Sequence, residues 1–324
     1  MRAMILAAGL GTRLQPLTSL RAKPALPVLG RPVIGFLLQW LHGHGVREVF
    51  VNLHHLAESI RDAAEKFRPR DMQIEYAYEA NPLGTGGGIR QAQSFLRQSN
   101  PSIVLAGDML FDADLTTLVQ HHKQRNSTCT LVLRRDPRIE AFGSIGVDAD
   151  QRIRRIAQRF DLGEETDAGL FTGLRLLSPS FFDLDPDQPP GIPFEDLSDW
   201  IAPALRGGNR SIHGHILEPA ESVWTPVGTP AEYLDANLRP PKLSYLQDDH
   251  LKAQGTTLRP APQSVVIGAG ASLGEGAQLE RCVIWDGEHV PAGFSGRGGV
   301  FAEGRFYALE NAEQPSPNDR SRKP

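Results

Sequence analysis

Glycine, arginine and lysine residues gather near the start of the chain. Gly9 and Gly11 follow a short apolar run, and Thr12, Arg13 and, a little later, Lys23 come after them. A glycine-rich turn after a buried strand lets backbone N–H groups approach phosphate oxygens without obstruction by side chains. A guanidinium adds a planar fork of donors that matches those oxygens, and an ammonium adds a compact positive charge. This segment therefore predicts a binding site for phosphate groups.

Two widespread phosphate-binding motifs do not fit this segment. The P-loop pattern G-x-x-x-x-G-K-[ST] does not occur in the sequence, and the dinucleotide pattern G-x-G-x-x-G fails because Leu14 occupies its last position. P-loop NTPases and nicotinamide-dependent dehydrogenases are therefore disfavoured.

Alternating strands and helices are expected to position these residues. Apolar spacing predicts a strand over 4–8, a helix over 33–45 and a strand over 48–53, which together form a βαβ unit. The same alternation predicts further helices over 56–67, 88–96 and 115–124 and further strands over 72–78, 102–106 and 128–133. The fold class expected is α/β, with a Rossmann-like, doubly wound and mostly parallel sheet.

The second half of the chain is less regular. It contains a strand-like run over 171–177 and a helical run over 231–237. From Ile267 onward, aliphatic residues recur at intervals of six among glycines, as at Leu273 and Leu279. This period is typical of a left-handed parallel β-helix. The predicted organisation is a large domain over 1–240, a linker over 241–262, a partial left-handed β-helix over 263–306 and a flexible tail over 307–324.

The overall composition excludes several classes of protein. The 324 residues include 34 basic and 38 acidic side chains, for a net charge of −4, so no general attraction to nucleic acid or to an anionic membrane is expected. No apolar run is long enough for a membrane span or a signal peptide. Cys129 and Cys282 are far apart and have no metal-binding spacing. They are interpreted as two reduced thiols in a cytoplasmic protein.

Several further motifs extend the opening segment, which reads G-x-G-T-R-L-x-P-L-T and is followed by K-P. They are the glycine-rich 83–88, the Ala-Gly-Asp of 106–108, the Phe-Thr-Gly of 171–173, the Val-Gly-Thr-Pro of 227–230, and 279–293. With these motifs the chain resembles the sugar-1-phosphate nucleotidyltransferases over roughly residues 1–306. Its layout is most similar to mannose-1-phosphate guanylyltransferase-like proteins with a C-terminal left-handed β-helix.

The resemblance implies that the domain over 1–240 is catalytic and requires Mg²⁺. The sugar-1-phosphate oxygen would attack the α-phosphorus of a nucleoside triphosphate in line, giving a nucleotide-sugar and pyrophosphate. Arg13 would hold the leaving pyrophosphate, Lys23 the triphosphate or the incoming phosphate, and Asp108 the metal ion. Arginine, lysine and Mg²⁺ suit this chemistry because two mutually repelling anions must be aligned and neutralised.

The resemblance also implies two sets of binding residues. Those expected to bind the nucleotide are Leu6, Ala8, Gly9, Gly11, Thr12, Arg13, Gly84 and Thr85. Those expected to bind the sugar phosphate are Arg159, Thr172, Gly173 and Glu195.

Two positions depart from the family pattern. Pro226 occupies the place of the family's second metal-binding aspartate, and proline has no side chain that accepts a bond from a metal. Gln158 and Arg159 replace a Glu-Lys pair. These departures leave open an alternative class, a nucleotide-sugar-binding regulatory protein with weakened catalysis. Glu221 and Asp235 are the carboxylates considered as replacements at the metal.

The substrates and the assembly are less closely defined. The β-helix favours mannose-1-phosphate guanylyltransferase, whereas Gly86, Gly87 and Gly88 are more similar to relatives that act on N-acetylmuramate or heptose 1-phosphates. GTP is taken as the first candidate nucleotide. A homo-oligomer is expected because an open coil end would expose unpaired strands.

Overall fold

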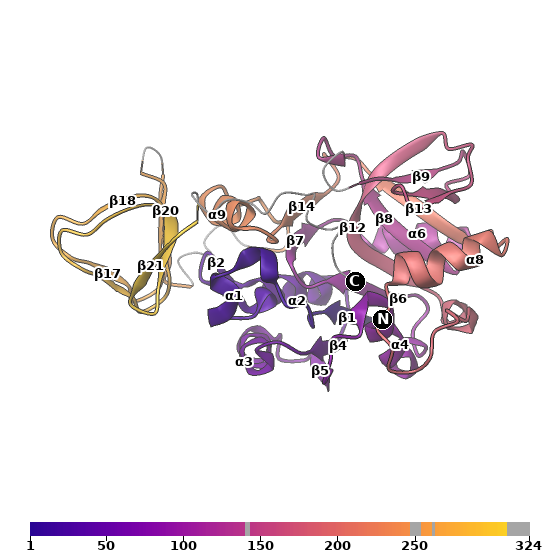
Figure 1. Cartoon of the computed structure of the whole chain (residues 1–324), viewed down its shortest axis with the longest axis horizontal. Helices are drawn as coiled ribbons and strands as arrows, with labels where there is room; N and C mark the ends of the chain where they lie inside the picture. Colours follow the sequence, from indigo (N-terminus) through magenta and orange to yellow (C-terminus); the bar gives the residue numbers. More distant parts are fainter. Residues whose placement is uncertain (140–142, 247–253, 261–262, 310–324) are drawn as a thin grey trace, which may run out of the picture.

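Four parallel strands form the half of the central sheet nearest the chain start. The computed structural model describes residues 1–139, 143–246, 254–260 and 263–309 (Figure 1). The strands lie in the order β6, β1, β4, β5, with bounds Ser102–Ala106, Arg2–Leu6, Glu48–Leu53 and Gln73–Tyr78. The chain runs outward from β1 to β4 and β5, then returns to the other side of β1 as β6. Ligands of α/β sheets bind at such a reversal of strand order.

Helices cover both faces of this sheet, as predicted. Because side chains alternate along β1, Ala3 and Ile5 point to one face and Met4 points to the other. The first face packs against α2 (Val33–Gly43), α3 (Ala57–Phe67) and α6 (Leu115–Gln124). The second packs against α4 (Gly84–Gln91), α5 (Gln93–Leu96) and α8 (Ala202–Arg206). Within the described ranges, no helix is both long and apolar enough to cross a membrane.

The other half of the sheet is mixed, which corrects the prediction of a mostly parallel sheet. Strand β12 (Asp167–Leu177) lies antiparallel between β6 and β8 (Cys129–Arg134). Helix α6 provides the crossover that lets β8 run in the same direction as β6. The chain from β8 to β12 passes through β9, β10 and β11 (Ile145–Val147, Ile153–Ile156 and Phe160–Asp161), and β13 (Ile212–Leu217) then pairs in parallel with β8.

Short elements complete the large domain. Near its start are η1 (Thr12–Leu14), α1 (Leu17–Leu20), η2 (Lys23–Ala25), β2 (Pro27–Val28) and β3 (Arg31–Pro32). Later come η3 (Pro179–Asp183), the π-helical turn η4 (Leu197–Ile201), and α9 (Pro230–Leu238), which confirms the helix predicted over 231–237. Strands β7 (Met109–Asp112) and β14 (Val223–Pro226) pair with each other outside the central sheet.

Stacked parallel strands form the C-terminal part. Strands β16, β18 and β20 pair in parallel, with β15 and β21 antiparallel at the two edges, and β17 pairs in parallel with β19. Their bounds, from β15 to β21, are Thr257–Arg259, Val265–Ile267, Ser272–Leu273, Gln278–Ile284, His289–Val290, Ser295–Ala302 and Arg305–Ala308. Strand β15 falls inside the stretch expected to be a linker. The predicted tail over 307–324 overlaps the end of β21, and its residues from 310 onward lie outside the described residues.

A shared apolar core joins this C-terminal part to the large domain, beside α9 (Figure 1). Val266, Val283 and Trp285 pack in one cluster with Tyr233 and Leu234 of α9. The indole N–H of Trp285 donates a hydrogen bond of 2.9 Å to the Tyr233 hydroxyl. The two parts are therefore held together by both apolar and polar contacts.

The buried His122 predicts a loss of stability in acid. Its two ring nitrogens lie 2.8 Å from Thr130 Oγ1 and 2.9 Å from Ser178 Oγ, and burial lowers its pKa to about 4. Between that value and the ordinary pKa of about 6.5, the unfolded chain binds a proton that the folded chain does not, so the free energy of unfolding falls as the pH falls. We expect His122 to account for a loss of about 2 kcal/mol between about pH 7.5 and about pH 5. Urea titrations at both pH values should show a smaller loss for His122→Gln; an equal loss would contradict the assignment to His122.

Candidate active site

A cavity of about 490 Å³ opens where the carboxyl ends of β1 and β6 meet. Ala7, Ala8 and Gly9 line it after β1, and Gly107 and Asp108 line it after β6. The Gly107 N–H donates a hydrogen bond of 2.9 Å to the Leu6 carbonyl, which holds the two strand ends together. The cavity therefore lies at the reversal of strand order, where the glycine-rich turn was expected to bind phosphate.

An ion pair marks the polar side of the cavity. Lys23 lies in η2 and is only 8% exposed, and its Nζ is 2.9 Å from Asp108 Oδ2. The Asp108 side chain is 37% exposed and faces the cavity that both residues line. The two groups most important to the predicted chemistry therefore meet, although they are far apart in the sequence.

The predicted nucleotide-binding residues fall into two groups. Those that line the cavity are Leu6, Ala8, Gly9, Gly11, Gly84 and Thr85. Thr12 and Arg13 are exposed in the short helix η1 and lie outside this lining. Arg13 nevertheless lies near the ion pair, since a methyl group built on Gly228 would be 3.5 Å from Arg13 Nη2 and 3.6 Å from Lys23 Nζ. The roles given to these residues remain predictions.

The Val-Gly-Thr-Pro of 227–230, which is the closing motif, lies against the end of β6 because β14 pairs with β7. Pro226 is opposite Met109, and the N–H of Val227 donates a hydrogen bond of 2.8 Å to the carbonyl of Asp108. Neither replacement carboxylate considered from the sequence lies there. Glu221 accepts a hydrogen bond from the Glu218 N–H beyond the opposite end of β14, and Asp235 pairs with Arg239.

The second glycine-rich segment forms the first turn of α4 rather than a loop, because the helix begins at Gly84 and not at residue 88 as expected. Gly84 has a φ of 72°, and a Cβ there would lie 2.4 Å from the Phe194 carbonyl oxygen. Only glycine suits this combination of left-handed backbone and close approach. The Thr85 hydroxyl donates to Glu195 Oε2 at 2.7 Å, so the chain around Phe194 and Glu195 is fixed to the start of α4.

Two buried polar residues that line the cavity were missed by the sequence reasoning. Asn52 Oδ1 accepts a hydrogen bond of 2.8 Å from the N–H of Ala7, and its amide donates one of 2.7 Å to Glu79 Oε1. The other oxygen of Glu79 accepts from the N–H of Leu83 at 2.8 Å. The sequence did offer a signal for both residues. Asn52 is a polar residue near the end of β4, and Glu79 directly follows β5. The pair joins the glycine-rich turn after β1 to the segment that leads into α4.

A buried ion pair forms another part of the cavity wall. Arg175 lines the cavity, and its guanidinium makes two hydrogen bonds to the Asp196 carboxylate, one of them from Nη2 at 2.9 Å. The N–H of Asp196 donates a hydrogen bond of 3.0 Å to the Thr85 hydroxyl. These contacts support the segment that carries Glu195.

Of the predicted sugar-phosphate residues, Gly173 and Glu195 line the cavity, whereas Thr172 and Arg159 do not. The hydroxyl of Thr172 is buried and donates a hydrogen bond of 2.8 Å to the carbonyl of Val132. Because side chains alternate along β12 and the neighbours Phe171 and Gly173 line the cavity, the side chain of Thr172 points to the opposite face of the sheet. Arg159 is exposed in the turn between β10 and β11. The structure therefore does not place these two side chains in the cavity.

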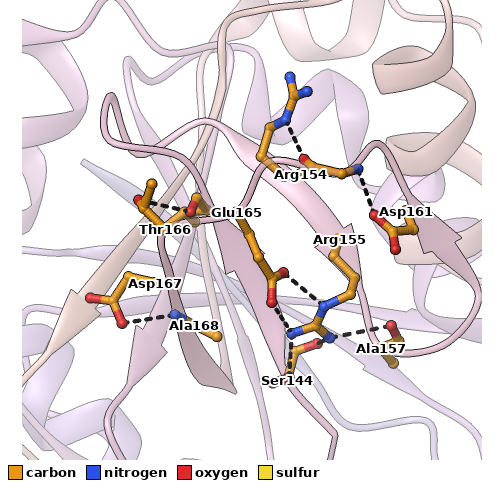
Figure 2. A network of polar contacts seen from close by, with 11 residues as sticks. Ser144, Arg154, Arg155, Ala157, Asp161, Glu165, Thr166, Asp167 and Ala168 are labelled. Atoms are coloured by element: carbon orange, nitrogen blue, oxygen red, sulfur yellow. Dashed lines mark hydrogen bonds and ion pairs between the residues drawn. The ribbon is translucent and has the colours of Figure 1, made fainter.

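Arg154 and Arg155, which precede Arg159 in the sequence, are held in place by local contacts. Figure 2 shows the Arg155 guanidinium bonded to Glu165, with Nε 2.7 Å from Oε2, and to the carbonyl and hydroxyl of Ser144. Arg154 donates to the carbonyl oxygen of Gly163 at 3.0 Å. These contacts brace the strands β9 to β12, so the arginine-rich stretch has a structural role here.

Asp108 has the chemistry of a magnesium ligand. Among the described residues, no three His, Cys, Asp or Glu side chains are grouped so that they could hold a metal ion. Mg²⁺ is commonly held by one or two carboxylates together with substrate phosphates and water. Asp108, at the polar side of a cavity that glycines also line, fits that arrangement.

Comparisons with known proteins identify the family. The Nucleotidyl transferase family matches residues 2–241. The mannose-1-phosphate guanylyltransferase of Mycobacterium tuberculosis is 30% identical over 306 residues, covering 90% of this chain and 81% of that protein. The UTP–glucose-1-phosphate uridylyltransferase of Synechocystis is 34% identical over 202 residues, covering 57% of this chain and 51% of that protein, so the match spans about half of the cyanobacterial protein.

A solved structure shares the fold. HddC from Yersinia pseudotuberculosis superposes with a TM-score of 0.60 at 24% identity, covering 74% of this chain and 98% of that one. Since the family match covers most of the chain and the relatives carry names of one reaction class, the chain belongs to the nucleotidyl transferase family, among the sugar-1-phosphate nucleotidyltransferases.

Proposed function

We propose that the cavity at β1 and β6 joins a nucleoside triphosphate to a sugar 1-phosphate, giving a nucleotide-sugar and pyrophosphate. The observation that carries this proposal is the Lys23–Asp108 ion pair, which faces the cavity directly beside the glycine-rich turn. A cation, a carboxylate and accessible backbone are thereby available to one bound triphosphate.

The residues of the chain mainly align and neutralise the reacting anions. An oxygen of the sugar 1-phosphate attacks the α-phosphorus, and the bond from this phosphorus to the bridging oxygen of the β-phosphate breaks. Arg13 and Lys23 stabilise the negative charge that develops on the departing pyrophosphate. Gly9 and Gly11 leave room for the phosphates at the turn that they form after β1. Gly173 and Glu195 line the part of the cavity assigned to the sugar phosphate.

Asp108 is the residue that would hold Mg²⁺. When bound, the metal would neutralise phosphate charge and polarise the reacting phosphoryl group. Asp108 would also hold Lys23 in place through their ion pair.

GTP and mannose 1-phosphate are the first substrates to test. The mycobacterial relative named for them matches 90% of this chain, a share too large to end before the C-terminal strands begin. The cyanobacterial relative, named for UTP and glucose 1-phosphate, makes these two the second pair to test.

We further propose that the stacked strands β16, β18 and β20 form a short left-handed β-helix and that the chain assembles as a homo-oligomer. The alternative of a regulatory protein with weakened catalysis is not favoured, because the relatives are named as enzymes.

Pyrophosphate release tests the proposal and identifies the substrates together. The purified protein would be incubated with Mg²⁺, each of the common nucleoside triphosphates and a panel of sugar 1-phosphates. We expect turnover that requires both substrates, with the highest rate for GTP and mannose 1-phosphate. Turnover with another pair would correct the substrates only, whereas no turnover with any pair would contradict the proposed function.

A further inference from the structure

A carboxylate that the family pattern did not suggest lies beside the closing motif. Glu232 is in the first turn of α9, directly after the Gly228-Thr229 segment. Its N–H donates to Thr229 Oγ1 at 3.3 Å, while its Oε2 accepts a hydrogen bond of 2.9 Å from the N–H of Gly228. These two contacts form a reciprocal cap of the helix. They also fix the position of the carboxylate, because the flexible side chain is held at both of its ends.

This carboxylate faces the cationic groups of the proposed site. A methyl group built on Gly228 would have Glu232 Oε2 at 3.0 Å, Arg13 Nη2 at 3.5 Å and Lys23 Nζ at 3.6 Å. The three charged atoms therefore surround one space that the absence of a side chain at Gly228 leaves open. Lys23 Nζ is in turn 2.9 Å from Asp108 Oδ2, so the lysine lies close to both carboxylate-bearing residues.

The backbone keeps this space close to Asp108. The hydrogen bond from the N–H of Val227 to the carbonyl of Asp108 fixes the closing segment at the residue immediately before Gly228. In the part of the chain that the structure describes, Glu232 makes no direct ion pair with Arg13 or Lys23, although both are near. Arg138 also interacts electrostatically with the Glu232 carboxylate, so three cationic side chains lie near it.

We propose that Glu232 supplies the second protein carboxylate of the metal site and so replaces the ligand that Pro226 cannot provide. This inference rests on the proposed function, because it takes Asp108 as the first ligand. In this arrangement Arg13 and Lys23 would bind the phosphates of the triphosphate, and Asp108 and Glu232 would hold the metal. Glu232 of α9 then replaces the metal ligand that is missing at Pro226.

Metal affinity tests the inference without any requirement for turnover. Mn²⁺ binding would be measured by electron paramagnetic resonance, first with the metal alone and then with inorganic tripolyphosphate, which has the phosphates of any nucleoside triphosphate but no base. We expect Glu232→Gln and Asp108→Asn each to weaken Mn²⁺ binding in the presence of tripolyphosphate by about tenfold or more. Glutamine retains an oxygen that can accept from the Gly228 N–H, so the helix cap and the fold are expected to persist.

Two further variants make the result specific. Asp235→Asn removes a carboxylate of the same helix that pairs with Arg239, and we expect it to leave Mn²⁺ affinity unchanged. Adding Pro226→Asp to Glu232→Gln should restore affinity, since an aspartate there would return a ligand to the same site. Unchanged affinity in Glu232→Gln together with a loss in Asp108→Asn would overturn the inference and leave the proposed function standing. Unchanged affinity in both variants would overturn the inference and the metal role of Asp108 together.

Discussion

Asp108→Asn is expected to lower kcat about a thousandfold while leaving the protein folded. The change removes one negative charge at the carboxyl end of β6 and keeps the shape of the side chain. Without this charge the proposed metal would lose a ligand, and Lys23 would lose its partner at 2.9 Å. The asparagine oxygen can still accept a hydrogen bond from Lys23, so we expect little change in the free energy of unfolding.

Steady-state kinetics and urea denaturation together check this expectation. The matched control is Asp235→Asn, which removes a carboxylate that pairs with Arg239 on α9, and it should retain kcat. A kcat for Asp108→Asn within about tenfold of the unmodified protein would contradict the role of Asp108, since a lost charge stabilisation of the transition state costs more.

Arg13→Ala should lower kcat/KM about a hundredfold or more and weaken triphosphate binding about tenfold or more. Arg13 is exposed in η1, next to the glycine-rich turn, and its guanidinium lies near Lys23 and Gly228. Because the Arg13 side chain is exposed and not part of the core, its removal should weaken phosphate binding and leave the free energy of unfolding nearly unchanged. Calorimetric titration with GTP and UTP measures the binding loss directly.

A second arginine provides the control for this variant. Arg239 has a side chain that is 71% exposed and pairs with Asp235, so Arg239→Ala should change neither affinity nor turnover. If Arg13→Ala binds GTP and UTP as tightly as the unmodified protein, Arg13 does not hold the triphosphate. Lys23 and the backbone of the glycine-rich turn would then be the main phosphate ligands.

The sequence predicted the parallel half of the sheet because its signals are local. Apolar runs such as 48–53 and helical spacing such as 33–45 depend only on neighbouring residues, and the structure confirms both as β4 and α2. The antiparallel position of β12 depends on which strands meet across the fold. No local pattern specifies that β12 is inserted between β6 and β8.

The candidate site was predictable where a motif follows a strand directly. The glycine-rich turn after β1 and Asp108 after β6 meet because parallel strands end at one edge of the sheet. Thr172 and Arg159 were predicted from the same resemblance but lie outside the cavity lining. Thr172 points away from the cavity along its strand, and Arg159 lies in an exposed turn between two strands.

Contacts between distant elements were beyond sequence reasoning. Glu232 was not considered, although Asp235 of the same helix was. A difference of three residues places two side chains close together around a helix, but only the cap at Gly228 turns Glu232 toward Arg13 and Lys23. Asn52 and Glu79 are a similar case, because their hydrogen bond joins the ends of two strands in the wall of the cavity.

The fate of each phosphate of the triphosphate tests the central claim most directly. The protein would be incubated with Mg²⁺, mannose 1-phosphate and GTP labelled with radioactive phosphorus at the α position in one sample and at the γ position in another. We predict that the α label appears in a nucleotide-sugar and the γ label in pyrophosphate, and that Asp108→Asn loses both products. Transfer of the γ label to the sugar, or its release as free phosphate independently of the sugar 1-phosphate, would contradict nucleotidyl transfer by this cavity.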